Sequence, residues 1–306
     1  MDNNNTQGFS VDALVPREMA AKMEVIGVAK VNLGPLRMLA LAILAGAFIA
    51  LGAIFSTTVT TGTGGVIPFG IGKLLGGLVF SLGLILVISA GAELFTGNNL
   101  IVMAWASGKV SSRSLLRNWT IVYLGNFVGS LLTAGIMLLS QQYSFGAGAV
   151  GLNALNIAST KVGYGFVQAL VLGILCNALV CLAVWLAAGA RSVTDKILAI
   201  IFPITAFVAA GFEHSVANMF FVPMGLLIKA FAPGTFWEAI GRSPVDFANL
   251  TWNNFLVANL LPVTIGNIIG GGVMVGLVYW FIYLRPSWTK HPLETESSEP
   301  ALATRR

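Results

Sequence analysis

The sequence predicts an all-α polytopic membrane protein with six transmembrane helices arranged as two related halves. Three observations support this prediction. Of the 306 residues, 56% are apolar and only 9% are charged; the apolar residues gather in long windows; and short motifs recur between the halves. A soluble domain carries about 25% charged residues, so this apolar excess does not fit inside a water-soluble globule. A bilayer is therefore the expected solvent for most of the chain.

Six apolar windows are long enough to cross a hydrocarbon core of about 30 Å, which takes roughly 20 helical residues. They run over residues 36–57, 73–106, 120–139, 163–190, 197–229 and 254–284. None shows the alternating ten-residue pattern of an outer-membrane strand, so we expect helices in all six.

Lys and Arg residues indicate the orientation of these spans. Of the 17 basic residues, only Lys73, Lys161, Lys229 and Arg242 fall on the side of the membrane opposite the two termini. The positive-inside rule therefore predicts that both termini are cytoplasmic. The first 35 residues lack a continuous apolar stretch, so we expect no cleavable signal peptide, and the first span directs insertion. Membrane topology accounts for the excess of basic over acidic residues, and no nucleic-acid partner is expected.

The parts of the chain outside the spans suggest three regions. Residues 1–35 form an N-terminal cytoplasmic segment, in which Pro16 opens an amphipathic helix that places Met19, Met23 and Ile26 on one face. This helix is either an anchor on the membrane surface or a gate over the pore. Residues 36–284 form the six-span channel domain. Residues 285–306 are rich in Pro, Ser, Thr and Glu and are predicted to be a disordered cytoplasmic tail.

Two internal matches divide the channel domain into repeats of about 36–140 and 163–284. A shift of 120 residues superposes a G-x-E-x-x-x-x-N pattern, at Gly91, Glu93 and Asn98 in one half and at Gly211, Glu213 and Asn218 in the other. A shift of 141 residues superposes Asn118, Gly125 and Asn126 on Asn259, Gly266 and Asn267. Since each half has three spans, the second half enters the membrane from the opposite side, which predicts an inverted 3+3 repeat.

The second and fifth spans are too long to be straight helices. Residues 73–106 and 196–229 each count 34 residues, or ~51 Å of helix, whereas the hydrocarbon core is only ~30 Å thick. Both contain the shared Gly, Glu and Asn pattern where a lipid-facing helix would be apolar. An interruption explains both facts, and such a break is tolerated only where protein or a water-lined cavity surrounds it. The breaks are therefore expected to face a pore.

Glu93 and Glu213 are the only carboxylates deep inside the apolar spans. A charge at this depth is costly, which makes each glutamate a functional candidate. Alternatively, each accepts hydrogen bonds from free backbone N–H groups and holds the break in shape. Because the spans contain no Lys or Arg to pair with these glutamates, both interpretations stay open.

Three positions beside the breaks suggest chemistry. His214 is the only histidine within the spans and can lend a proton to a passing weak acid, or it simply satisfies a local hydrogen bond. The Thr96 hydroxyl can bond a substrate oxygen or the imidazole, or cap a half-helix that begins near Leu100. Leu94 and Phe95 suggest a constriction, and half-helix N-termini favour an anion over a cation.

The segments Gly91-Ala92-Glu93-Leu94-Phe95-Thr96-Gly97 and Gly211-Phe212-Glu213-His214-Ser215-Val216-Ala217-Asn218 resemble the two signature segments of the formate/nitrite transporter family, and within it those of the bacterial formate channels. The resemblance extends from the N-terminal helix to Leu284 and includes Lys161 and the segment 262–267. It implies an aquaporin-like protomer with one substrate pore, assembled as a homopentamer in the inner membrane of a bacterial cell.

The resemblance also implies roles for individual residues. His214 would be the central pore histidine and Thr96 its partner. The substrate pore and proton relay would comprise His214, Thr96, Asn177, Lys161, Glu213 and Asn267. The cytoplasmic constriction would comprise Leu94, Phe95 and Val180, and the periplasmic one Phe80, Leu84 and Phe207. The breaks themselves would rest on Gly91, Glu93, Asn98, Gly211 and Asn218.

The function that follows is a pH-dependent channel for formate and similar small monovalent weak-acid anions. The channel would either export the anion passively or couple its uptake to a proton, through transient protonation of the anion by His214. Nitrite or hydrosulfide is the alternative substrate. A neutral-solute channel of the aquaporin type is less favoured because paired Asn-Pro-Ala motifs are missing. No cofactor or metal is expected, since no second histidine or thiolate has ligand spacing. An enzyme is not expected either, because the spans lack a Ser-Lys pair and a histidine cluster.

Overall fold

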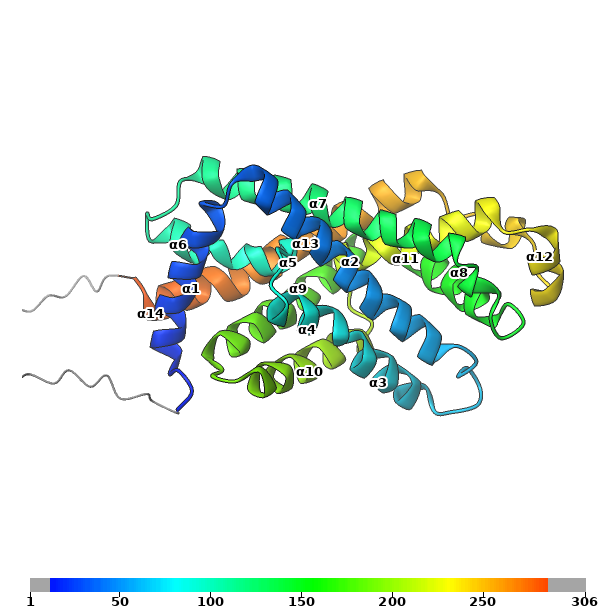
Figure 1. Ribbon diagram of the computed structural model, residues 1–306, viewed down its shortest axis with the longest axis horizontal. Helices are drawn as coiled ribbons and strands as arrows, with labels where there is room; N and C mark the ends of the chain where they lie inside the picture. Colours follow the sequence, from blue (N-terminus) through cyan, green and yellow to red (C-terminus); the bar gives the residue numbers. More distant parts are fainter. Residues whose placement is uncertain (1–11, 286–306) are drawn as a thin grey trace, which may run out of the picture.

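The protein is described by a computed structural model over residues 12–285, and this part of the chain consists of helices and connecting loops without a strand (Figure 1). The predicted all-α class is confirmed. The tail predicted to be disordered lies, apart from Arg285, outside the described residues. Asp12 and Arg285, the first and last of the described residues, lie at the same end of the molecule.

Within residues 12–285, five helices are long and apolar enough to cross a membrane. They are α2 (Pro35–Thr60), α3 (Phe69–Phe80) continued by α4 (Leu82–Ser89), α7 (Ser112–Leu139), α9 (Phe166–Gly189) and the segment Asn254–Tyr283. The bent pair α11 (Ser215–Phe231) and α12 (Gly234–Ile240), which meets at 112°, raises the number to six if it counts as one span. The last segment comprises η4 (Asn254–Leu260), α13 (Leu261–Ile268), η5 (Ile269–Leu277) and α14 (Val278–Tyr283).

Both long windows are interrupted where the shared motif lies. In the second, α4 stops at Ser89 and the chain resumes as α5 (Phe95–Asn98), η1 (Asn99–Ile101) and α6 (Val102–Ala106). In the fifth, α10 (Val193–Ala209) stops before α11 begins. Gly91 and Gly211 turn the chain out of these helices with φ of +80° and +74°, a backbone conformation that glycine adopts without steric cost.

The connections hold further elements that hydropathy does not mark. Helix α8 (Ala149–Val162) lies between the third and fourth windows and packs against α11. At 14 residues it is too short for a span. Its buried residues Val150, Ala154, Leu155, Ala158 and Val162 recur at three- and four-residue spacing. The connections also contain two short helical turns, η2 (Gln142–Ser144) and η3 (Pro244–Phe247).

Glycines bring the packed helices close together in both halves. A Cβ on Gly129 of α7 would lie 2.0 Å from the carbonyl oxygen of Ile43 in α2. A Cβ on Gly270 of η5 would lie 2.1 Å from that of Ile174 in α9. Only glycine permits such an approach of two backbones, which is a common way of packing helices in membranes.

Helix α1 (Pro16–Val31) lies across the end of the bundle that holds both described termini (Figure 1). Met19 and Met23 are buried against α6 and α9, and Ile26 packs beside them. An ion pair between Glu24 and Lys109 fastens the helix to the loop after α6. The apolar face of this amphipathic helix therefore contacts the protein, which argues against a role of the helix as a membrane-surface anchor.

Candidate functional site

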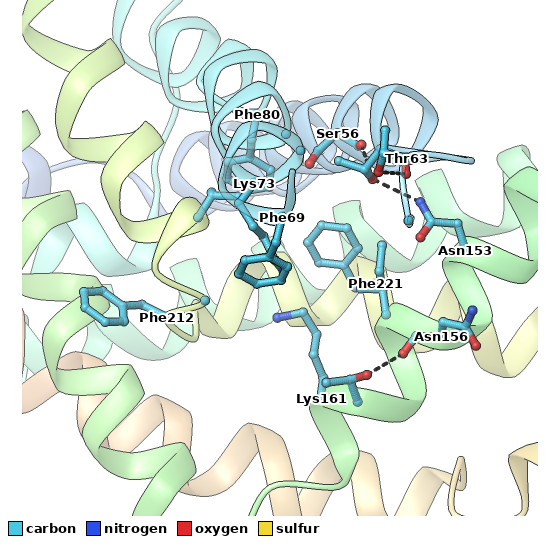
Figure 2. Close-up of a pocket in the computed structure, with 18 of the residues that line it drawn as sticks. Ser56, Thr63, Phe69, Lys73, Phe80, Asn153, Asn156, Lys161, Phe212 and Phe221 are labelled. Atoms are coloured by element: carbon cyan, nitrogen blue, oxygen red, sulfur yellow. Dashed lines mark hydrogen bonds between the residues drawn. The ribbon is translucent and has the colours of Figure 1, made fainter. Parts of the chain in front are cut away.

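Two large cavities lie within the described residues, one at each end of the molecule. The distal vestibule, far from the described termini, has a volume of about 460 Å³, and Lys73 and Lys161 line it (Figure 2). Its third charged lining residue is Glu213. The terminal vestibule lies beneath α1 and has a volume of about 540 Å³. Its charged lining residues are Lys22, Lys30, Glu93 and Lys196. Burial and the nearby Lys196 and Arg191 lower the pKa of Lys22, which lies outside the spans.

An apolar barrier separates the two vestibules, which share no lining residue. Phe80, Phe207 and His214 form the floor of the distal vestibule: the two phenyl rings meet edge to face at 5.7 Å, and Phe207 stacks on the imidazole at 5.9 Å. Leu84, which was predicted to join Phe80 and Phe207 in the periplasmic constriction, instead lines the terminal vestibule together with Leu94. A charged ion cannot cross such a barrier cheaply, because it would lose its water without gaining a partner.

Thr96 and His214 meet inside this barrier. The Nδ1 atom of His214 accepts a hydrogen bond of 3.0 Å from the backbone N–H of Ala217 and so caps α11. Because an accepting ring nitrogen carries no proton, this bond assigns the imidazole proton to Nε2, which lies 2.9 Å from Oγ1 of Thr96. The imidazole is then the donor, and the Thr96 hydroxyl hydrogen is left for another oxygen. The prediction that Thr96 caps a half-helix near Leu100 is wrong, since α5 begins at Phe95.

The first break is held by two side chains that bond several groups each. Glu93 accepts hydrogen bonds from Nζ of Lys30 at 2.6 Å and from Nδ2 of Asn98 at 2.7 Å. Asn126 of α7 clamps the backbone: its Nδ2 donates to the carbonyl of Glu93 at 2.9 Å, and its Oδ1 accepts from the N–H of Phe95 at 2.9 Å. The break deprives the Glu93 carbonyl and the Phe95 N–H of helical partners, and Asn126 bonds both of these groups.

The second break repeats the same contacts. Glu213 accepts hydrogen bonds from Lys161 at 2.7 Å and from Nδ2 of Asn218 at 2.7 Å. Asn267 donates to the carbonyl of Glu213 at 3.0 Å and accepts from the N–H of Ser215 at 2.9 Å. The glutamates are therefore components of a duplicated frame around each break.

The lysine partners overturn the expectation that nothing basic reaches the two glutamates. Lys30 and Lys161 come from α1 and α8, outside the spans, and their side chains extend to the breaks. Lys30 was missed by sequence reasoning. The two lysines occupy equivalent places, since the backbone N–H groups of Glu93 and Glu213 bond the carbonyls of Leu41 and Leu172, which follow the two lysines at equal spacing; only the structure shows this equivalence.

Several predicted pore residues lie beside the cavities without lining them. Asn177 is fully buried and donates to the carbonyls of Thr96 and Asn267, at 3.2 and 2.7 Å. Phe95 packs its ring edge-on against Tyr123 of α7 at 4.9 Å. Val180 is buried and lines neither vestibule. Of the predicted constriction formed by Leu94, Phe95 and Val180, only Leu94 faces a vestibule.

Within residues 12–285, no cluster of three or more His, Cys, Asp or Glu side chains could hold a metal ion. Cys176 and Cys181 are buried free thiols in α9. The arrangement that remains is two basic vestibules separated by an apolar barrier that contains a hydroxyl–imidazole pair: His214 lines the distal vestibule, and Thr96 lines neither.

Comparison with known proteins places this geometry among transporters. The family model described as "Formate/nitrite transporter" matches residues 17–281. The formate channel FocA of Escherichia coli strain K12 is 52% identical over 274 residues, which cover 90% of this chain and 96% of the relative. A solved structure titled "Pentameric formate channel with formate bound" superposes with a TM-score of 0.78 at 52% identity, covering 82% of this chain and 98% of that one. An "FNT family ion channel" superposes with a TM-score of 0.71 at 29% identity, covering 87% and 98%.

Proposed function

The chain belongs to the formate/nitrite transporter family, and from this premise we propose that it is a channel for formate and similar small monovalent weak-acid anions in a bacterial cytoplasmic membrane. The observation that carries the proposal is the pair Thr96–His214, which lies between two basic vestibules and inside an apolar barrier. A weak acid can pass such a barrier as a neutral molecule and can be collected outside it as an anion.

The proposed path has three stages. Lysine charge in a vestibule raises the local concentration of the anion. The Thr96 hydroxyl then bonds a carboxylate oxygen at the barrier, in a site where water is excluded and a hydrogen bond to a charged group is strong. The anion takes up a proton there and crosses as the acid. Flux in either direction follows the gradients of anion and proton.

His214 becomes a proton donor in this scheme only after it gains a second proton. Since Nε2 already carries one, the second must bind Nδ1, which requires release of the Ala217 N–H bond. We propose that this release links flux to pH: the cationic imidazole passes its Nε2 proton through the Thr96 hydroxyl to the anion, and the net change is one proton moved from His214 to the substrate.

The protomer is proposed to assemble as a homopentamer with both termini in the cytoplasm. Support comes from the pentameric relative and from apolar side chains that α7 leaves exposed, namely Leu124, Val128, Leu132 and Ile136. A face of this kind suits either a neighbouring copy or lipid. Native mass spectrometry of the purified channel tests the subunit number, with a monomer as the contrary result.

Substrate-resolved flux in proteoliposomes tests the main proposal. We expect formate to enter down its gradient, to accumulate when a proton gradient is imposed, and to be slowed by nitrite if both share the path. A larger maximal flux of nitrite or hydrosulfide than of formate would reassign the substrate within the family. Osmotic swelling with glycerol and no formate flux would favour a neutral-solute channel. The relatives are named as channels and transporters, which supports a role other than catalysis.

A further inference from the structure

The charged lining of the two vestibules contains lysines of two kinds. Lys161 and Lys30 each pair with a buried glutamate, at 2.7 and 2.6 Å. Lys73 lines the distal vestibule, Lys196 and Lys22 line the terminal one, and no ion pair involves these three lysines among the described residues. Only an unpaired charge contributes fully to the potential that an approaching anion meets.

The paired lysines belong to the frame of the breaks. Besides the ion pairs of their side chains, the two lysines bond the frame through their backbone carbonyls. The Lys161 carbonyl accepts a hydrogen bond from Asn259 at 2.8 Å, and the Lys30 carbonyl accepts one from Asn118 at 3.4 Å. Asn259 and Asn118 in turn bond Asn218 and Asn98, the partners of the glutamates. This duplicated set of contacts is structural in both halves.

The net charge of each vestibule follows from its lining. In the distal vestibule Lys161 and Glu213 cancel, which leaves the charge of Lys73. In the terminal vestibule Lys30 and Glu93 cancel, which leaves Lys22 and Lys196. Lys22 keeps its charge, but its hydrogen bond of 2.7 Å to the carbonyl of Ala188 fixes its amino group at that oxygen, so Lys196 is the lysine that is left to meet an anion.

The unpaired lysines Lys73 and Lys196 both lie near the start of a helix that leads toward a break. Lys73 is the fifth residue of α3 and Lys196 the fourth of α10, and these helices lead into the two breaks. Both side chains are half-buried. The ammonium of Lys73 lies 5.4 Å from the ring centre of Phe69, a contact that holds the cation at the vestibule wall without neutralising it (Figure 2). Hydroxyl and amide groups of Thr60, Thr63 and Asn153 line the same cavity.

We propose that Lys73 in the distal vestibule and Lys196 in the terminal vestibule are the anion-collecting residues of this channel, and that Lys161 and Lys30 serve the frame. The inference rests on the proposed function, because it concerns the same anion path. Neither lysine touches the barrier residues in this scheme; each acts on the concentration of anion that reaches them.

Initial formate influx through oriented proteoliposomes tests the inference, with the exposed face identified by proteolysis of a tag at the N-terminus. At low ionic strength, Lys73→Gln is expected to raise the half-saturating concentration of formate presented to the distal face by about threefold to tenfold, the size of one screened charge. The same variant leaves the value for the terminal face unchanged. Lys196→Gln is expected to have the opposite sidedness, and Lys73→Arg to behave as the wild type.

Ionic strength separates charge from structure. The Debye length falls from about 30 Å at 0.01 M salt to about 3 Å at 1 M, so the difference between wild type and Lys73→Gln should vanish in high salt. Lys229→Gln is the matched control, because Lys229 bonds the carbonyls of Phe247 and Leu250 and lines neither vestibule.

Three results would overturn the inference. They are an unchanged half-saturating concentration in both glutamine variants, an equal change from both faces, and a change that neither arginine nor salt removes. A wild-type channel that conducts no formate would instead refute the proposed function. The same comparison would then be made with nitrite or hydrosulfide, and it judges the lysines independently.

Discussion

Oγ1 of Thr96 lies 2.9 Å from Nε2 of His214, although the two residues are 118 positions apart and belong to different halves of the chain. Each is positioned by the start of its own half-helix: Thr96 is the second residue of α5, and His214 caps α11. The contact therefore depends on both breaks at once. Variants of this contact, of the frame that holds it and of the helix packing around it test the arrangement.

Replacement of His214 by Asn is expected to abolish the pH response of formate flux and to preserve the fold. Asparagine is a preferred N-cap, so its side-chain oxygen can accept the Ala217 N–H bond, but it does not titrate. The measurement is initial influx per unit of bulk formic acid between about pH 5 and 8. His214→Phe is the comparison that loses both the cap and the titration. A wild-type response in His214→Asn would refute the proton role.

Thr96→Val is expected to lower formate flux by about tenfold or more, because a hydrogen bond between a hydroxyl and a charged group contributes about 1.5–3 kcal/mol. Valine keeps the shape of the buried side chain. Thr96→Ser restores the hydroxyl and should keep most of the flux, as measured by formate-dependent swelling of proteoliposomes. Equal flux in the valine and serine variants would show that the hydroxyl does not meet the anion.

Lys161→Met is expected to destabilise the protein by about 3 kcal/mol, since it leaves a buried carboxylate without its counter-charge. Lys30→Met should cost less. The side chains of Lys161 and Glu213 are 14% and 2% exposed, whereas those of Lys30 and Glu93 are 25% and 7% exposed, and solvent screens the second pair more. Thermal unfolding of the two variants in detergent gives the comparison. The reverse order would contradict the burial argument.

Gly91→Ala and Gly211→Ala are each expected to cost about 1–2 kcal/mol, the strain of a left-handed residue that carries a Cβ. The added methyl group meets nothing within 4 Å at either position. At Gly129 the strain is steric instead, because a Cβ would lie 2.0 Å from the Ile43 carbonyl oxygen.

Gly129→Ala should therefore lower the unfolding temperature more than either alanine variant at the breaks, by an amount that corresponds to about 3 kcal/mol or more. Gly135→Ala in the same helix is the control, because nothing lies within 4 Å of its Cβ. An unfolding temperature of Gly129→Ala equal to that of this control would show that α2 and α7 do not approach so closely.

Hydropathy and internal repeats predicted much of this fold. Both were sufficient because a bilayer imposes a length on each span and because an interruption requires polar residues at fixed places. The breaks were located through Glu93 and Glu213 for this reason. Helix α8 was missed since a 14-residue segment carries no span signal, although its Lys161 had already been singled out.

The site was predicted less completely than the fold. His214 and Thr96 were recognised because polar groups inside a span are rare. The partner of Glu93 was not, because the side chain of Lys30 comes from α1, and reach across a vestibule leaves no local pattern. Phe95 was assigned to the constriction from its position in the chain, whereas the direction of its ring depends on packing against Trp119 and Tyr123.

The paired clamps formed by Asn126 and Asn267 have a consequence for how such a channel can change over generations. Each clamp holds its loop by main-chain N–H and C=O groups, which every amino acid except proline possesses. The side chains of Leu94 and Thr96 are therefore replaceable without loss of the loop's shape, and so is that of His214 where the new residue can still cap α11. Mutation can thus alter what the aperture admits while the scaffold survives, so a lineage with this architecture can acquire a new cargo through a handful of substitutions.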